Sequence, residues 1–471
     1  MTHYLRINCH EADNLTGGMV ERIRYNTTMN DQRCNEHIIE SHYPISFRKK
    51  DTEALTQTIK RHESVCLVAM KKVGISTFVR HYFYNNELKK QQFGDDTDRY
   101  LFIYCDCNDL LEVTDRAFWI LLLTRCAEGL AGSCANQKVK KEGDKLFLRA
   151  LSAKDSFIYF DSLRKIAELI SANTDLYVTF FLLRFDRLQP IFDKNIGNNL
   201  YALIDKVKGR LSYITTSVRP LNEIAPNTFS QNLPIFVRSQ YIAPASLRDM
   251  KSIQNYLNLV PTYCPKLTGT LQKTIIEIGS GHITISRIIV IVISEWNDIP
   301  EKKSEIMHKL LRDERINMAC EEIWENLIHE ERYLIQDILT KKRPQIPATE
   351  SFLLKSGVLI VNNGIVSLFS PLFKQWVAKK IESFTSNGIH DLTKKEELLL
   401  NLLQSKNIEI CRREEIIEQV WPEYQNSEDL AVSDWAIDRL VSRLRKKIKM
   451  IDTYQSWRIV TLRSRGYRLL R

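Results

Sequence analysis

Residues 432–448 read VSDWAIDRLVSRLRKKI and predict a single amphipathic helix. Ser433 is a good N-cap residue, so the helix is expected to begin there. At 100° per residue, the apolar side chains share one face, namely Ile437, Leu440, Val441, Leu444 and Ile448. The opposite face carries Trp435, Arg439, Ser442, Arg443 and Lys446. The pattern therefore indicates one face that packs and one basic face that is exposed to solvent.

The residues on both sides of this helix complete a small domain. Thr393 and Glu396 have the spacing of a capping box, which begins a leucine-rich helical pattern. A second helical pattern ends at Pro422. After the basic helix, two strands are expected at 457–462 and 467–470, joined by a connection that carries two arginines. Two helices, a basic helix and a hairpin predict a winged helix.

The net charge of the chain is concentrated at the same end. The chain has 471 residues and a formal net charge of +10. From residue 439 to the last residue there are 11 lysines and arginines against one acid, Asp452, so this tail alone accounts for the net charge. Basic residues clustered in this way favour nucleic acid as a partner.

The whole region 391–471 resembles the OmpR/PhoB-type winged-helix DNA-binding domain, through LTKKEELLLNLL, RREEIIEQVWP, VSDWAIDRLVSRLRKKI and IVTLRSRGYRLL in that order. In that family the third helix enters the major groove and the wing reaches the adjacent minor groove. The resemblance implies base contacts by Arg439, Ser442 and Arg443. It implies phosphate contacts by Arg445, Lys446 and Thr461, and a wing role for Arg463. Trp435 and Arg465 complete the candidate DNA-binding residues.

One residue departs from the family pattern, and two other interpretations stay open. Ser464 stands where the family's wing has a glycine, which bears on the turn and on the reach of Arg463. A basic helix face is often only a solvated face, and some winged helices bind protein or only pack. The central arginines nevertheless favour DNA, because arginine binds guanine O6 and N7 in a bidentate manner.

A second informative stretch is AMKKVGIST, residues 69–77, which follows the apolar run 65–68. A phosphate-binding loop has the pattern G-x-x-x-x-G-K-[ST], in which backbone amides and the lysine hold phosphate and the hydroxyl holds magnesium. Ala69 replaces the first glycine and Ile75 replaces the lysine. The candidate nucleotide-binding residues are Lys72, Gly74, Ser76, Thr77 and Arg219.

Three further strands are expected at 101–107, 177–183 and 211–216, separated by helical stretches, as a parallel α/β sheet requires. This order resembles a STAND-type, AAA-like P-loop ATPase over residues 45–300. The resemblance rests on CLVAMKKVGIST as the phosphate loop, YVTFFLLRFDRL as the Walker B strand, YITTSVRPLNEI as the sensor strand and IGSGHITISRI in the helical lid. A second small winged helix follows, with a hairpin turn at Asn363-Gly364.

The resemblance also shows that the catalytic positions are altered. The Walker B acids align with Leu183 and Arg184, with Asp186 nearby, and Ile283 stands in place of the lid proline. Without the lysine and the acids, a transferred phosphoryl group has no evident stabiliser, so ATPase activity is not expected. Binding of ATP or ADP stays open. The alternative is that Ser76 caps a helix and Arg219 pairs with a surface carboxylate.

We therefore expect a multidomain α/β plus α+β protein: a P-loop NTPase-like parallel sheet with a helical lid, a middle winged helix, and a C-terminal winged helix-turn-helix. The expected domains are an N-terminal leader of unknown structure (1–45), a degenerate P-loop NTPase-like domain (46–300), a winged-helix-like domain (301–385) and the OmpR/PhoB-type domain (391–471). Residues 385–391, which contain Gly388, are the expected linker.

The spacing of the cysteines and the length of the apolar runs predict the cellular compartment of the protein. The ten cysteines have no zinc-ligand spacing, although Cys105 and Cys107 are expected on one face of a strand, as packed thiols or as a metal or redox pair. The apolar runs are far shorter than the ~20 residues that span a bilayer, and residues 1–45 show no signal-peptide pattern. We expect a cytoplasmic protein with no membrane association, no metal site and no certain cofactor.

The sequence leaves three functions to compare. The first is a transcription regulator with a degenerate ATPase-like sensing module and a winged-helix output that binds double-stranded DNA. The second is a STAND-type ATP-binding signalling switch in which the winged helices serve assembly or protein contacts, and the third is a scaffold that uses neither. RNA polymerase, an upstream signalling protein and self-association are open as further partners. The front of the chain lacks the acidic pocket of a phosphorelay receiver, so aspartyl phosphate is not the expected input.

Overall fold

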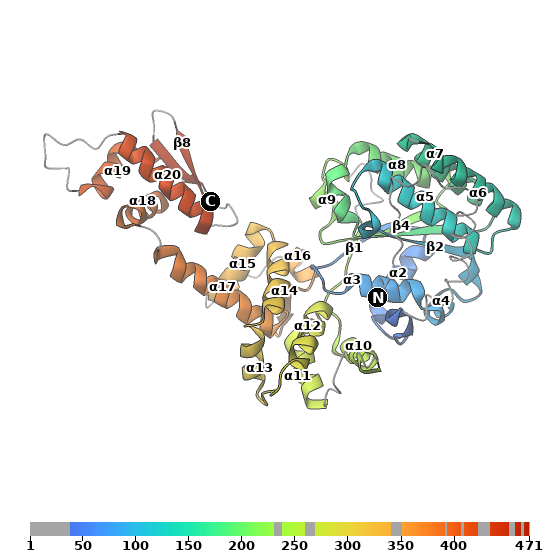
Figure 1. Cartoon of the computed structure of the whole chain (residues 1–471), viewed down its shortest axis with the longest axis horizontal. Coiled ribbons are helices and arrows are strands. Elements are labelled where there is room, and N and C mark those ends of the chain that lie inside the picture. The colour runs from blue at the N-terminus through green and yellow to red at the C-terminus, as the bar shows by residue number, and fades with distance from the viewer. Residues whose placement is uncertain are drawn as a thin grey trace. The chain divides into compact units, whose positions relative to one another are not determined.

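The computed structural model describes residues 38–153, 155–229, 238–259, 269–340, 351–390, 393–406, 409–422, 434–451, 457–462 and 466–470. The chain divides into two compact units (Figure 1). The N-terminal unit contains the residues up to Asn326 together with Pro347–Pro371, and the C-terminal unit contains Leu327–Ile346 and Leu372–Arg471. Of the expected leader, residues 1–37 lie outside the described residues.

The N-terminal unit is built on a five-stranded parallel sheet of order β2-β3-β4-β1-β5. Its strands are β1 (Val65–Val68), β2 (Tyr100–Asp106), β3 (Tyr177–Leu183), β4 (Leu211–Ser217) and β5 (Ser239–Tyr241). All four neighbouring pairs are parallel. The parallel α/β sheet predicted from the sequence is confirmed, and the short strand β5 is an addition that the sequence did not indicate.

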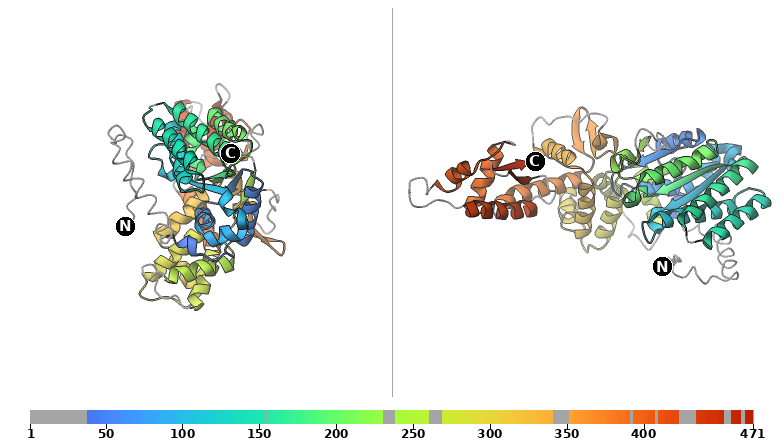
Figure 2. Two further views of the ribbon diagram at one scale, coloured as in Figure 1. Left: turned by 90° about the vertical axis from the view of Figure 1, so that its right-hand side faces the viewer. Right: turned by 90° about the horizontal axis from the view of Figure 1, so that it is seen from above.

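Helices cover both faces of this sheet. The helices α5 (Asp115–Gly132), α6 (Gln137–Leu151), α7 (Ser156–Asn173) and α8 (Lys194–Lys206) lie on one side. The helices α2 (Lys49–Lys60), α3 (Ile75–Tyr84) and α4 (Asn86–Phe93) lie on the other side (Figure 1 and Figure 2). Burial of both faces explains why β3 and β4 are nearly continuous apolar or small-residue runs.

The edge strand β2 alternates instead, with Leu101, Ile103 and Cys105 buried against α5. Cys107, predicted on the same strand face as Cys105, lies in the 3-10 helix Cys107–Asp109 that follows the strand. The strand ends one residue earlier than predicted because the Asp106 side chain accepts the Asn108 N–H and turns the chain. Both thiols are fully buried, and burial raises their pKa values, as expected for packed thiols.

Residues 38–45 belong to the folded part of the N-terminal unit. A short 3-10 helix, Ile39–His42, precedes Tyr43 and Phe47, whose rings lie 5.0 Å apart. These rings join a buried cluster that includes Met250, Ile276 and Ile283. The chain therefore enters the sheet through a segment anchored in the core.

The remainder of the N-terminal unit is helical. It contains α9 (Leu221–Ile224), α10 (Leu247–Leu259), α11 (Gly269–Gly279), α12 (Ile283–Ser294), α13 (Lys303–Leu310), α14 (Glu314–Glu325) and α16 (Phe352–Lys355). The hairpin of β6 (Leu359–Asn362) and β7 (Ile365–Leu368) follows. Asn363 and Gly364 both have positive φ, 50° and 76°, which confirms the predicted type I′ turn.

The C-terminal unit contains α15 (His329–Thr340), α17 (Pro371–His390), α18 (Lys394–Ser405), α19 (Arg413–Val420) and α20 (Asp434–Ile451). Its hairpin is formed by β8 (Arg458–Leu462) and β9 (Gly466–Leu470). The predicted helices and strands after residue 392 are all found, although the expected N-cap Ser433 lies outside the described residues. Residue 391, the last of the expected linker, also lies outside them.

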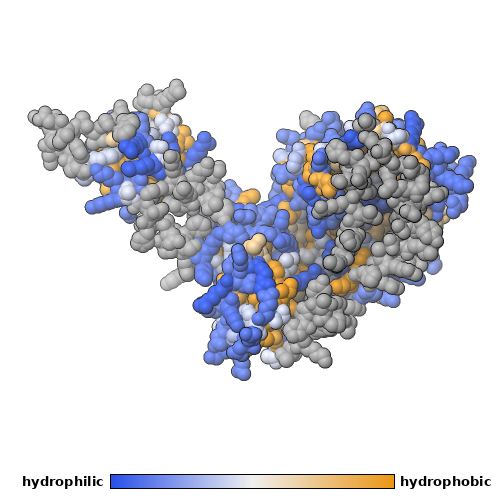
Figure 3. All heavy atoms as spheres, viewed as in Figure 1, coloured by the Kyte–Doolittle hydropathy of each residue, from blue (hydrophilic) through white to orange (hydrophobic). Residues whose placement is uncertain are grey.

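The expected linker at 385–391 is corrected by α17, which continues to His390. A glycine inside a helix costs only about 1 kcal/mol relative to alanine, so Gly388 is not enough to end a long helix. Among the described residues, no helix is long and apolar enough to cross a membrane. The face of the molecule in Figure 3 is mainly hydrophilic, with smaller apolar areas between.

Candidate functional site

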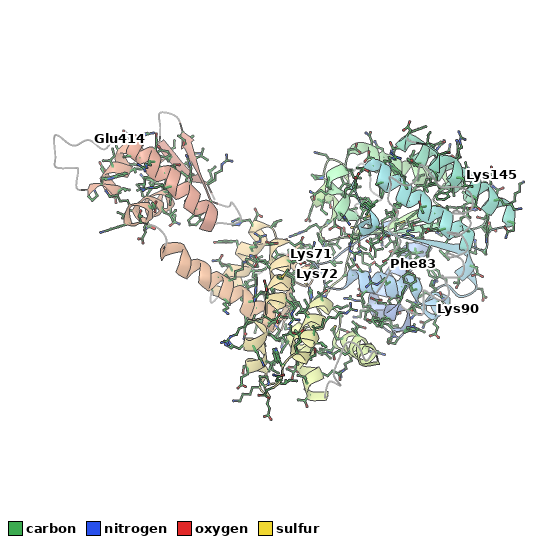
Figure 4. All side chains as sticks on the ribbon, viewed as in Figure 1. Lys71, Lys72, Phe83, Lys90, Lys145 and Glu414 are labelled. Carbon is green, nitrogen blue, oxygen red and sulfur yellow. The ribbon has the colours of Figure 1, made fainter. Side chains whose placement is uncertain are left out.

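The loop between β1 and α3 makes a tight turn. Residues 69–74 connect β1 to α3, with Lys72 at φ 59° and Gly74 at φ 111°. A Cβ on Gly74 would lie 2.3 Å from the Cδ1 atom of Ile283, so only glycine fits there. Lys71 and Lys72 are exposed on this loop (Figure 4). The first turn of α3 thus follows a tight turn, as the sequence predicted.

The beginning of α12 binds the carbonyl groups of this loop. Thr284 Oγ1 donates to the Lys72 carbonyl at 2.8 Å, and the Ile283 N–H donates to the Val73 carbonyl at 3.4 Å. A proline at position 283 would have no N–H for this bond, so isoleucine at this position has a structural use. These contacts of α12 hold the loop in shape, and within the loop the Val73 N–H donates to the Met70 carbonyl at 3.3 Å.

His282 makes the third contact between α12 and the loop. Its Nδ1 atom accepts the Ile285 N–H at 3.2 Å, so its Nε2 atom carries the proton and donates to the Lys71 carbonyl at 3.0 Å. The imidazole is fully buried, and burial lowers its pKa to about 4. His282 is therefore a neutral structural residue at neutral pH.

Both candidate cations of the nucleotide site bind protein groups. The Lys72 ammonium lies 2.6 Å from the Glu322 carboxylate of α14. Arg219 donates to the Asn326 carbonyl at 2.9 Å and lies over the Phe352 ring at 3.8 Å, with Glu223 at 3.9 Å. The predicted alternative of a carboxylate partner for Arg219 is therefore observed, although the closest contacts are the carbonyl and the ring.

Ser76 and Thr77 lie in the first turn of α3, and Thr77 is buried. The N-cap residue of α3 is Gly74, and no side chain caps this helix, so the alternative that Ser76 caps it is wrong. Ser76 is at the second helical position, where its hydroxyl cannot take the place of an N-cap side chain. The residues retained from the motif are the second glycine, Gly74, and the hydroxyl residue Ser76, without the first glycine and the lysine.

An arginine occupies the edge of the sheet where Walker B acids are expected. Arg184 follows β3 with φ 53°, donates its backbone N–H to Thr216 Oγ1 at 2.7 Å, and pairs through its guanidinium with Asp106 at the end of β2. The Asp186 carboxylate accepts the Val218 N–H at 3.4 Å, and burial raises its pKa. Within the described ranges, no group of three or more His, Cys, Asp or Glu side chains could hold a metal ion. This edge thus carries an ion pair in place of paired acids.

The helix α20 separates an apolar face from a polar one, as predicted. Its apolar residues are at most 4% exposed and form the core of the surrounding domain with residues of α18, α19 and the hairpin; they are Ile437, Leu440, Val441, Leu444 and Ile448. Arg439, Ser442 and Arg443 are exposed. The side chains of Trp435 and Lys446, and the whole of Arg463 and Arg465, lie outside the described residues.

Two arginines on the flanks of α20 bind neighbouring elements. Arg443 Nε lies 3.5 Å from Oε1 of Glu396, a buried residue at the start of α18. On the other flank, Arg445 Nε donates to the Ile459 carbonyl at 2.9 Å, and its Nη2 donates to Thr461 Oγ1 at 2.7 Å. Arg445 and Thr461, both expected to contact phosphate, are therefore bonded to each other in this structure.

A network that the sequence did not reveal connects α19, α20 and β9. Arg413 Nη2 donates to Asp438 Oδ1 at 2.7 Å and to the Tyr467 hydroxyl at 3.1 Å, and that hydroxyl donates to Asp438. The Tyr467 hydrogen bond, followed by Arg413, lowers the pKa of Asp438. The only sequence signal for it is a tyrosine placed after a glycine at the start of a strand.

The position of β9 depends on Gly466. The backbone of Tyr467 exchanges two hydrogen bonds with Cys411, at 2.8 and 2.9 Å, so the hairpin gains a third strand-like partner before α19. Gly466 has φ 129°, and a Cβ there would lie 2.1 Å from the Cys411 carbonyl oxygen. Only glycine allows this close approach.

The comparison with protein families decides what the C-terminal part is. Residues 388–469 match the family model "Transcriptional regulatory protein, C terminal". This result agrees with the helix, helix, basic helix and hairpin order seen here, and it confirms the predicted OmpR/PhoB-type winged helix. No curated protein matches the chain.

Solved structures resemble the chain at low identity. The Walker-type ATPase of Pyrococcus abyssi is 14% identical, with a TM-score of 0.43, over 70% of this chain and 96% of that chain. The ORC1 protein of Aeropyrum pernix in complex with DNA is 11% identical, with a TM-score of 0.32, over 90% and 88%. Drosophila ORC bound to DNA is 12% identical, with a TM-score of 0.36, over 93% and 88%.

Proposed function

We propose that this protein is a DNA-binding transcription regulator in which the OmpR/PhoB-type winged helix binds double-stranded DNA and the P-loop NTPase-like module senses or transmits a signal without hydrolysing ATP. The observation that carries the proposal is α20, whose apolar face is buried while Arg439, Ser442 and Arg443 are exposed. An exposed helix face rich in arginine matches the width and the acceptor groups of the major groove.

The charge distribution supports the same partner. The residues from 439 onward contain 11 of the 67 lysines and arginines and carry the whole net charge of +10. Because each cation near a phosphate releases a condensed counterion, such a surface binds DNA of any sequence and gains specificity from a few base contacts. We assign base contacts to Arg439, Ser442 and Arg443, and phosphate contacts to Lys446 and to the Arg445–Thr461 pair. Arg463 and Arg465 are assigned to the wing.

The proposed loss of hydrolysis rests on the residues around the phosphate loop. Ile75 supplies no cation, Lys72 is paired with Glu322, and Arg184 stands where an acid would coordinate magnesium. Negative charge that develops on a transferred phosphoryl group would meet no free cation and no metal ligand pair among these residues. We therefore expect the module to transmit a signal through its conformation or through proteins that bind to it.

A nucleotide-binding switch is the second candidate, and the backbone of the loop favours it. Lys72 and Gly74 have positive φ values, and the hydrogen bonds that α12 makes to the loop go to its carbonyl groups. Calorimetric titration of ATP and ADP into the full chain separates the two candidates. Tight binding together with nucleotide-dependent assembly, and no affinity for DNA, would favour the switch.

The experiment that tests DNA binding begins with selection from a random duplex pool by the full chain, followed by affinity measurements on the selected duplex and on a shuffled duplex of equal length. Arg443→Ala is expected to cost about 1–3 kcal/mol on the selected duplex and much less on the shuffled one, because it removes a base contact. Lys446→Ala is expected to weaken binding to both duplexes equally, and to lower the slope of log affinity against log salt concentration by about 1.

A charge-matched control separates position from net charge. Lys145 is exposed on α6, in the N-terminal unit, and Lys145→Ala removes one positive charge there (Figure 4). This variant is expected to bind both duplexes like the unaltered chain. Equal losses for Arg443→Ala and Lys446→Ala on both duplexes would mean that α20 is only an electrostatic surface, and full affinity in both would move the binding surface off α20.

A further inference from the structure

The buried carboxylate of Glu396 lies behind the exposed face of α20. Its side chain is 1% exposed, in contrast to that of Arg443, which is 53% exposed. Glu396 Oε2 accepts the Thr393 N–H at 2.8 Å, which is the capping-box bond that begins α18. Its other oxygen, Oε1, faces Arg443 Nε at 3.5 Å. One carboxylate thus serves a helix start on one side and an arginine of the exposed helix on the other.

The capping role alone does not require a negative charge at this position. Glutamine caps a helix in the same way, because its side-chain oxygen accepts the same backbone N–H. A buried carboxylate is costly unless an opposite charge lies close to it. Arg443 supplies an opposite charge close to Glu396, and this contact is separable from the cap.

In this contact the Nε side of the guanidinium faces Glu396. With Nε turned towards Glu396, the two terminal nitrogens of Arg443 are the edge that is left for another partner. An arginine reads guanine through two parallel hydrogen bonds to O6 and N7, so the affinity depends on the orientation of its planar fork. A side chain that is already oriented loses less rotamer entropy when it binds.

We infer that Glu396 is a positioning residue for DNA recognition: its buried carboxylate orients Arg443 so that the terminal guanidinium nitrogens meet a base edge. This inference rests on the proposed function. Because Glu396 also neutralises part of the Arg443 charge, Arg443 contributes to discrimination between sequences more than to general attraction for phosphate. Replacement of Glu396 by a neutral isostere is then expected to lower specificity without lowering affinity for random DNA.

The test uses the full chain, the duplex selected from the random pool and a shuffled duplex of equal length. Glu396→Gln is expected to keep the cap and to lower the ratio of selected to shuffled affinity by at least about threefold. Its affinity for the shuffled duplex is expected to stay the same or rise, since one negative charge is removed. The matched control is Glu414→Gln, an exposed acid on α19 (Figure 4), which removes the same charge and is expected to leave the ratio unchanged.

A double-mutant cycle distinguishes positioning from a general effect on the fold. If Glu396 acts through Arg443, the variant that combines Glu396→Gln with Arg443→Ala has the same ratio as Arg443→Ala alone. Arg443→Ala leaves Glu396 buried without this partner, which can lower stability. Thermal unfolding midpoints are therefore measured for every variant, and binding is compared at a temperature below all of these midpoints. An additive fall of the ratio in the double variant would overturn the inference.

The outcomes for the inference and for the proposed function are distinct. If the unaltered chain binds neither duplex, the proposed function fails and the inference fails with it. If the unaltered chain prefers the selected duplex and Glu396→Gln keeps that preference in full, only the inference is overturned. A lower ratio in Glu396→Gln with a normal ratio in Glu414→Gln supports the inference.

Discussion

Single residues at the beginning of α12 hold the loop that follows β1. Ile283 contributes an N–H to the Val73 carbonyl and a side chain that contacts Gly74, neither of which a proline would reproduce in the same way. His282 completes the contact through a neutral imidazole. Three residues at the beginning of α12, namely His282, Ile283 and Thr284, therefore hold the loop through its carbonyl groups.

The Ile75→Lys change tests whether this loop still binds phosphate. We expect higher affinity for ATP than in the unaltered chain, because a lysine after Gly74 restores a cation beside the free amides of the first turn of α3. Calorimetric titration measures the difference. An unchanged titration would show that the loop is not a phosphate loop. Steady ATP hydrolysis by the unaltered chain that Ser76→Ala abolishes would contradict the proposed loss of activity.

Titration of His282 predicts how the N-terminal unit responds to acid. The folded pKa, about 4, is below the ordinary value of 6.5, so between these values the unfolded state binds more protons than the folded state. Stability therefore falls as the pH is lowered from 7 towards 4, by about 3 kcal/mol from this residue. Urea denaturation at pH 7 and pH 4.5 should show a smaller loss in His282→Gln.

His308→Gln is the control for that experiment, because His308 is an exposed histidine in the same unit. We expect it to keep the full loss of stability between the two pH values. An equal loss in His282→Gln and in the unaltered chain would mean that another group accounts for the acid sensitivity.

At the scale of elements, the start of α18 and the turn of the β6–β7 hairpin follow from neighbouring residues. The capping box of Thr393 and Glu396 begins α18 as the sequence predicted, and Asn363-Gly364 forms the predicted turn between β6 and β7. In contrast, α17 continues through most of the expected linker to His390, because one glycine inside a helix costs too little to end it.

Thr393→Ala is expected to destabilise the start of α18 by about 1 kcal/mol, because the hydroxyl that accepts the Glu396 N–H at 3.4 Å is lost. Hydrogen exchange of the α18 amides in the full chain measures this change. Thr393→Ser keeps the acceptor and is expected to behave like the unaltered chain. If the α18 amides of both variants exchange equally fast, and faster than those of the unaltered chain, the methyl group of Thr393 and not the cap supports this helix.

At the scale of the whole molecule, the winged-helix domain has a core of its own. Its buried apolar residues all come from 399–469, and they include residues of all three of its helices and both strands. Because the described residues of this core all lie within 399–469, we expect a fragment that begins at residue 391 to fold independently.

The fragment 391–471 should therefore unfold in one cooperative thermal transition, followed by circular dichroism. A fragment that begins at 371 includes the whole of α17 and serves as the comparison. A transition in the longer fragment alone would mean that α17 is part of the folding unit and that the domain begins earlier than residue 391.

The sequence by itself determined the helices, strands and turns that depend on signals from neighbouring residues. Periodicity predicted the two faces of α20 and the strands β1 to β4, and capping and turn residues predicted α18 and the β6–β7 turn, because each signal lies within a few neighbouring residues. The order of these elements then predicted the parallel sheet and the winged helix, and the resemblance to known families agreed with both.

Only the tertiary structure decided which candidate side chains have partners. Arg445 lies next to Lys446 in the sequence, yet its bonds are to β8, and Arg443 meets Glu396, which is remote in the sequence. Lys72 and Arg219 bind groups on α14 and beside α16 in the same manner. Helical periodicity predicts which face of a helix carries a residue. The partner of that residue depends on packing between segments that are distant in the sequence, which no local pattern encodes.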